Sequence, residues 1–93
     1  MQRRNSNSEG SKLLQQLLEF NFMTLIVTPF DDGSGKEEII LELYKDLDDH
    51  PIYGLTTGPY KDQGLLDARY RQLLLQLERY VTIQTIKATT HEH

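Results

Sequence analysis

The strongest constraint on the fold is the stretch from Phe20 to Phe30, which reads FNFMTLIVTPF. Both alternating sets of side chains in it are apolar, which is typical of a central strand covered on both faces. Pro29 cannot donate to a ladder of strand hydrogen bonds, so we expect the strand to end near Thr28. A loop is then expected from Pro29 to Gly35.

Helical periodicity precedes and follows this strand. Ser11 can cap a first helix over residues 11–19, and its apolar stripe would consist of Leu13, Leu14, Leu17 and Leu18. A second helix is expected from Ser34 or Gly35 to His50, because Pro51 forces the preceding residue out of the helical region. Its buried stripe would consist of Ile39, Ile40, Leu43 and Leu47, with Leu41 on another side.

The longest predicted helix covers residues 65–80, where the helical period is kept by Leu66, Tyr70, Leu73, Leu74 and Leu77. Two further strands are expected, at 52–56 and at 81–88, the latter because it is rich in β-branched residues. The predicted class is therefore α/β, a small three-stranded sheet with three helices in the order αβαβαβ.

Residues 60–64 leave an alternative open. If this segment pairs back on 52–56, the result is a ferredoxin-like βαββαβ arrangement of the α+β class, preceded by an extra N-terminal helix. We favour the parallel α/β sheet, because Tyr-Lys-Asp-Gln at 60–63 is poor strand material.

The chain has 93 residues, of which 38% are hydrophobic and 26% charged, which suits one folded domain. The polar segment 1–10 is expected to be a disordered N-terminal tail and 11–93 a single α/β domain. The sequence has no cysteine, which excludes disulfides and favours a cytoplasmic localisation. No apolar run approaches the ~20 residues that cross a bilayer, so no membrane partner is expected.

The net charge of −4 comes from 14 acidic and 10 basic side chains. An acidic surface repels phosphate backbones, so we expect no nucleic-acid partner. Three arginines, Arg69, Arg71 and Arg79, share the last predicted helix with Asp67 and Glu78, which indicates a mixed solvated face.

The segment PFDDGSGKEE at 29–38 comes close to two phosphate-handling motifs. A P-loop needs Gly where Phe30 stands and a hydroxyl where Glu37 stands, and an aspartyl phosphatase needs its nucleophile at Phe30. His91 and His93 flank Glu92 at the C-terminus, where a rigid metal site is not expected. The sequence therefore predicts no catalytic residue, no cofactor and no metal site.

Residues 25–58 also combine Thr28-Pro29, an acidic glycine turn and Thr56-Thr57-Gly58. This pattern resembles part of the class I pyruvate-dependent aldolases of the dihydrodipicolinate synthase and N-acetylneuraminate lyase type, where the paired threonines hold the substrate carboxylate. The leading Gly of that motif is Leu55 here, and 93 residues are too few for a (β/α)₈ barrel of ~250 residues. We interpret the resemblance as a local strand-helix-strand pattern.

The leading functional hypothesis is a small non-catalytic protein-interaction or regulatory module, acting as a homodimer through an acidic face and an apolar patch. Its interface residues would be Leu41, Leu75, Arg71 and Arg79. The alternative is a phosphate- or metal-binding domain that uses the Pro29–Lys36 loop, with Asp31, Asp32, Ser34, Lys36, Thr56 and Thr57 as ligand-binding residues. A nucleic-acid mimic that blocks a basic partner is a third hypothesis.

Overall fold

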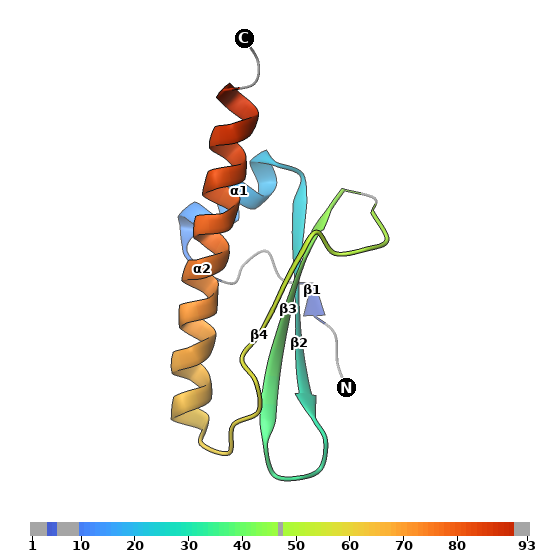
Figure 1. The fold of residues 1–93 in the computed structure, drawn as a ribbon, viewed down its shortest axis with the longest axis vertical. Helices are drawn as coiled ribbons and strands as arrows, with labels where there is room; N and C mark the ends of the chain where they lie inside the picture. Colours follow the sequence, from blue (N-terminus) through green and yellow to red (C-terminus); the bar gives the residue numbers. More distant parts are fainter. Residues whose placement is uncertain (1–3, 6–9, 47, 91–93) are drawn as a thin grey trace.

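The computed structural model describes residues 4–5, 10–46 and 48–90. Its elements are β1 (Arg4–Asn5), α1 (Lys12–Phe20), β2 (Met23–Asp31), β3 (Glu37–Lys45), β4 (Tyr53–Thr56) and α2 (Gln63–Thr90). The strands form one sheet in the order β1-β2-β3-β4, and every neighbouring pair is antiparallel. Figure 1 shows α2 running the length of the molecule beside this sheet. The mixed helix-and-strand class is confirmed, but the parallel αβαβαβ order is wrong.

The first helix forms where its cap predicts it. The Ser11 hydroxyl accepts a hydrogen bond from the Leu14 backbone N–H at 3.1 Å, which satisfies one of the free donors at the start of α1. Leu14 and Leu18, four residues apart, point into the core and are fully buried. At the other end, Asn21 donates through its backbone N–H and its side chain to the Leu17 carbonyl.

The second predicted helix, from Ser34 or Gly35 to His50, is wrong: β3 occupies Glu37–Lys45. β2 and β3 form a hairpin in which Met23 pairs with Lys45 and Asp31 with Glu37. Alternation explains the strand, because Leu41 and Leu43 are buried in the core while Glu42 between them is only half-buried. Since β3 replaces the helix, the strand-helix-strand pattern behind the aldolase resemblance is not present in residues 25–46 and 48–58.

β2 also continues through Pro29, where we expected a loop. Pro29 lies opposite Ile39, whose backbone N–H and C=O both bond to Thr57 on the far side, at 2.9 and 3.0 Å. The Pro29 nitrogen therefore faces away from β3, toward an edge where β1 pairs only with Ile26 and Val27. The missing N–H costs no ladder bond, so the strand tolerates the proline.

The strand expected at 52–56 is present as β4, Tyr53–Thr56. Tyr60 does not pair back on β4, as the ferredoxin-like alternative required, but forms a bridge with Glu37 on β3. Their backbone groups exchange hydrogen bonds of 2.8 and 2.9 Å. Because no helix separates β2 from β3 and no described strand follows α2, the ferredoxin-like alternative is also wrong.

The last helix starts near its predicted position but does not stop at Tyr80. Asp62 begins it, since its side chain accepts from the Leu65 N–H and its carbonyl from the Leu66 N–H. The strand expected at 81–88 is wrong, because α2 continues to Thr90. Val81 lies four residues beyond Leu77 and extends the same buried stripe, so tertiary packing outweighs the β preference of this segment.

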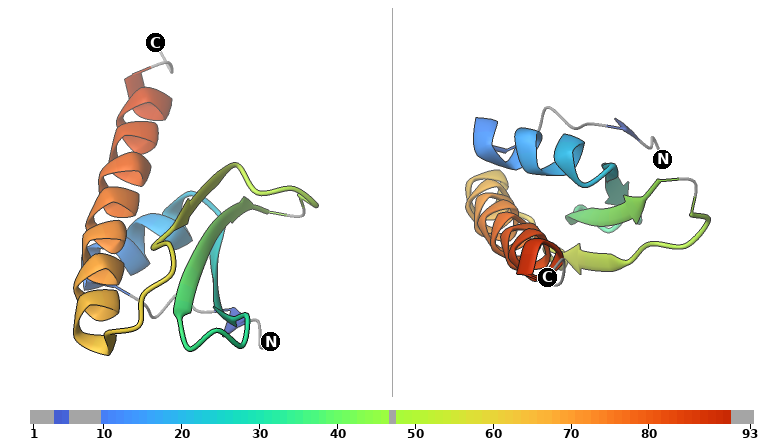
Figure 2. Two further views of the ribbon diagram at one scale, coloured as in Figure 1. Left: turned by 60° about the horizontal axis from the view of Figure 1, so that its bottom comes forward. Right: turned by 90° about the horizontal axis from the view of Figure 1, so that it is seen from above.

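Both helices pack on one face of the sheet (Figure 2). The core consists of Leu14, Leu18, Met23, Leu25, Val27, Leu41, Leu43, Leu73, Leu77 and Val81. The rings of Tyr53 and Tyr80 stack at 3.9 Å and join β4 to α2. The expectation that β2 is covered on both faces is wrong for the described residues, because no described helix lies on its second face.

Within the described ranges, no helix combines the length and the apolar character that a membrane crossing requires. The expected tail at 1–10 falls mostly outside these ranges. Of it, the structure describes the strand Arg4–Asn5 and Gly10.

Candidate functional site

The turn between β2 and β3 is held together by its own aspartates. The Asp31 carboxylate accepts from the Gly33 N–H at 2.8 Å, and the Asp32 carboxylate accepts from the Ser34 N–H at 2.9 Å. Hydrogen bonds from the side chain and backbone of Ser34 lower the pKa of Asp32. Gly33 has a φ of 86°, a conformation that a side chain disfavours. These contacts are those of a tight hairpin turn.

The two threonines of the predicted ligand site are engaged elsewhere. The Thr57 hydroxyl accepts from the Ile39 N–H and donates to the Gly58 carbonyl at 2.8 Å. The Thr56 hydroxyl donates to the Glu38 carboxylate and accepts from the Gly58 N–H. Thr56 pairs with Ile40, which is three residues along β3 from the hairpin's closing residue Glu37, or about 10 Å.

The structure therefore does not gather the predicted ligand-binding residues into one pocket. Lys36 is exposed in the turn, and among the described residues no three His, Asp or Glu side chains lie close enough to share a metal ion. His91 and His93, at which no rigid metal site was expected, lie outside the described residues.

The predicted interface residues divide between core and surface. Leu41 was expected on an exposed side of a helix, but it lies in β3 with 1% of its surface exposed and belongs to the core. Leu75 is 66% exposed on α2, and Arg71 and Arg79 are exposed beside it. Of the four predicted residues, these three share the surface of one helix.

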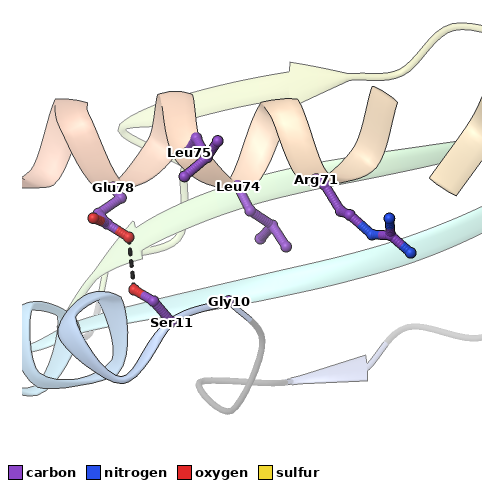
Figure 3. A pocket seen from close by; sticks show the side chains of 6 residues that line it. All are labelled: Gly10, Ser11, Arg71, Leu74, Leu75 and Glu78. Atoms are coloured by element: carbon purple, nitrogen blue, oxygen red, sulfur yellow. Dashed lines mark hydrogen bonds between the residues drawn. The ribbon is translucent and has the colours of Figure 1, made fainter. Parts of the chain in front are cut away.

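A pocket of about 240 Å³ lies next to Leu75. It is formed where the start of α1 approaches α2, and its lining is Gly10, Ser11, Arg71, Leu74, Leu75 and Glu78. Figure 3 shows Glu78 reaching from α2 toward Ser11, whose hydroxyl donates to its carboxylate at 2.6 Å. The hydrogen bond closes one end of the pocket and fixes the position of Glu78.

The extension of α2 beyond Tyr80 reveals apolar side chains that the sequence analysis did not assign to this surface. Ile83 is 44% and Ile86 is 56% exposed, and at the start of the helix Leu65 is 58% exposed. At 3.6 residues per turn, these three and Leu75 lie on the side of α2 opposite the buried stripe. The available signal was helical spacing continued past residue 80, but the threonines and isoleucines there favoured a strand.

We name this surface the outer face of α2: Leu65, Ala68, Gln72, Leu75, Arg79, Thr82, Ile83 and Ile86. In Figure 2, α1 and the sheet lie on one side of α2, and no described element covers the other. A protein surface normally carries single apolar residues, whereas here four large ones follow one line along a helix.

A second pocket, of about 360 Å³, lies beneath the C-terminal half of α2. It is lined by Asn21, Met23, Lys45, Ile52, Tyr80, Gln84, Lys87 and Ala88. These residues come from four separate parts of the chain, so no local sequence pattern could have predicted the pocket.

Comparison of this chain with protein-family models, curated proteins and solved structures finds no significant match.

Proposed function

We propose that this protein is a non-catalytic interaction module that binds another protein chain through the outer face of α2. The observation that carries the proposal is the alignment of Leu65, Leu75, Ile83 and Ile86, each between 44% and 66% exposed, along one side of a single helix. Such a stripe is the usual contact surface of a helix that packs against a partner helix or groove.

The energetics support binding at this face. Removing a Leu or Ile side chain fully from water is worth about 1.5 to 3 kcal/mol, and these side chains have roughly half of their surface still to bury. Four of them together therefore offer about 4 kcal/mol on one partner alone, before ordering costs. Arg71 and Arg79 border the stripe, and arginine is enriched in such contacts.

The alternative function, binding of a phosphate or metal ion by the Pro29–Lys36 loop, has weaker support. Asp31 and Asp32 use carboxylate oxygens to hold the turn, and the hydroxyls of Thr56 and Thr57 bond within the chain. A thermal-shift screen with inorganic phosphate, Mg²⁺ and Ca²⁺ tests this alternative. A stabilisation that disappears in Asp32→Ala would favour ligand binding.

The interaction function is tested by affinity capture from the native host, with wild type, Leu75→Arg and the control Lys61→Glu. Leu75 and Lys61 are both exposed, so each variant should keep the circular dichroism spectrum of the wild type. We expect wild type and the control to retain a specific protein, either a different one or further copies of this chain, and Leu75→Arg to lose it.

The proposal is wrong if wild-type protein retains nothing specific, or if Leu75→Arg retains the same proteins in the same amounts as wild type.

A further inference from the structure

The outer face of α2 has a repeat that suits a second helix. Seven of its eight positions follow one another at alternating spacings of three and four residues, as in the seam of a two-helix coiled coil: 65, 68, 72, 75, 79, 82 and 86. The eighth, Ile83, lies beside this seam. From Leu65 to Ile86 the seam is about 31 Å long. The partner surface that fits it best is therefore a straight helix of similar length.

The order of side chains along the seam is nearly symmetric about its middle position, Leu75. Reversing this order exchanges Leu65 with Ile86 and Ala68 with Thr82, and it leaves Leu75 at the centre. A copy of α2 packed antiparallel would therefore set a large apolar residue against another at both ends and Leu75 near the centre. Unrelated helices have no reason to match this order.

Charge also selects the antiparallel arrangement. Reversal places Arg79 opposite the neutral Gln72, whereas a parallel pair would set Arg79 against Arg79. On the flank of the seam that faces α1, reversal brings Arg71 of each copy close to Glu78 of the other. Two ion pairs would thus form, one on each side of the two-fold axis.

Shape adds a further element of self-complementarity. Leu75 projects from α2 next to the 240 Å³ pocket between α2 and the start of α1. Because the projection and the pocket lie together beside the axis, each copy would place its Leu75 over the pocket of the other.

From these observations we propose that the occupant of the outer face of α2 is a second copy of this chain, packed antiparallel about a two-fold axis at Leu75. The inference rests on the proposed interaction function and specifies its partner. The protein is then a homodimer whose centre is formed by two α2 helices and whose two sheets face outward.

The absence of cysteine allows single cysteines to report the geometry. Each variant is purified, checked for mass in solution against the 10.8 kDa of one chain, and exposed to a mild oxidant. Leu75→Cys should cross-link to itself. Leu65→Cys and Ile86→Cys should not cross-link separately but should do so when mixed. Asp48→Cys, exposed in the loop between β3 and β4, is the control for random collision.

Charge exchange gives a second, independent measurement by sedimentation equilibrium. Arg71→Glu should weaken dimer formation at least about fivefold, because it sets the introduced carboxylate against Glu78 of the other copy. The double variant Arg71→Glu with Glu78→Arg should restore most of the affinity, since the pair is only reversed. Failure of the double variant to recover affinity would contradict the antiparallel pairing.

Other outcomes also overturn the proposal. If the protein is a monomer at millimolar concentration, a second copy does not occupy the outer face of α2. If Leu65→Cys cross-links to itself, the two helices pack parallel. Cross-linking of Asp48→Cys as fast as that of Leu75→Cys means random collision. If the protein is monomeric yet loses a host protein on Leu75→Arg, the interaction function stands and only the homodimer fails.

Discussion

At the scale of single residues, Thr57 shows how one hydroxyl can hold two strands in register. It is 6% exposed, and its hydroxyl both accepts from the Ile39 N–H and donates to the Gly58 carbonyl. A side chain of the same shape without the hydroxyl would leave the Ile39 N–H without this partner in a poorly hydrated position.

We therefore expect Thr57→Val to lower the free energy of unfolding by about 1 to 3 kcal/mol, measured by urea denaturation. The neighbouring Thr56→Val is the matched control, because Thr56 is exposed and water can replace its contacts. Equal effects of the two substitutions would contradict the role assigned to Thr57.

The backbone conformation of Phe22 is energetically unfavourable. It has a φ of 55°, in the left-handed region that residues with a Cβ avoid, and it is 72% exposed, so little burial offsets this cost. Phe22→Gly should raise the free energy of unfolding by roughly 1 kcal/mol. Phe22→Ala should not, because alanine also has a Cβ. Urea denaturation of both variants measures these changes. If Phe22→Ala raises the free energy of unfolding as much as Phe22→Gly, the left-handed backbone conformation is not the cause of the gain.

At the scale of elements, the C-terminal end of α2 extends beyond the sheet and needs its own support (Figure 1). The Thr82 and Thr85 hydroxyls donate to carbonyls four residues earlier, but such bonds slightly destabilise a helix and do not supply this support. The tertiary link is Asn21, whose side chain ends α1 and donates to the Thr85 hydroxyl at 2.8 Å. This corner joins the two helices.

A double-mutant cycle with Asn21→Ala and Thr85→Val measures the link. We expect the two residues to be coupled by about 0.5 to 1.5 kcal/mol in the free energy of unfolding. Additive effects of the two substitutions would mean that the hydrogen bond does not stabilise the corner.

The elements also show why the sequence predicted some parts of the fold and missed others. Local signals were enough where a cap or a period was unambiguous, as at Ser11 and in the first half of α2. In β3, Ile39, Ile40 and Leu43 fit a helical stripe, and Ile39, Leu41 and Leu43 fit a strand equally well. Pairing with β2 favours the strand over the helix, and the local sequence pattern does not contain information about that contact.

The candidate site was predictable to a similar extent. Leu75 could be recognised on the exposed side of its helix from local period alone. Ile83 and Ile86 could not, because β-branched residues favour strands in isolation and only packing of Val81 against the core continues the helix. Leu41 was misplaced for the same reason as β3 itself.

At the scale of the whole molecule, the described residues measure 52 × 25 × 18 Å, because α2 spans the full length of one side. If two copies pack along this side, the folded dimer is favoured by mass action over unfolded single chains. The midpoint of thermal unfolding should then rise with protein concentration. In Leu75→Arg the midpoint should not change over the same range, and a flat midpoint in wild type would contradict dimer formation.

The prolines near the margins of the sheet have a consequence for its behaviour in concentrated solution. Pro29 offers no N–H on one margin, while β4 on the other has only four residues and lies between Pro51 and Pro59. Along the described parts of these margins, a strand from another molecule would find no long row of free donors and acceptors to join. Growth of fibrils by addition of strands to these margins is therefore disfavoured, and the protein can be crowded without its sheets polymerising.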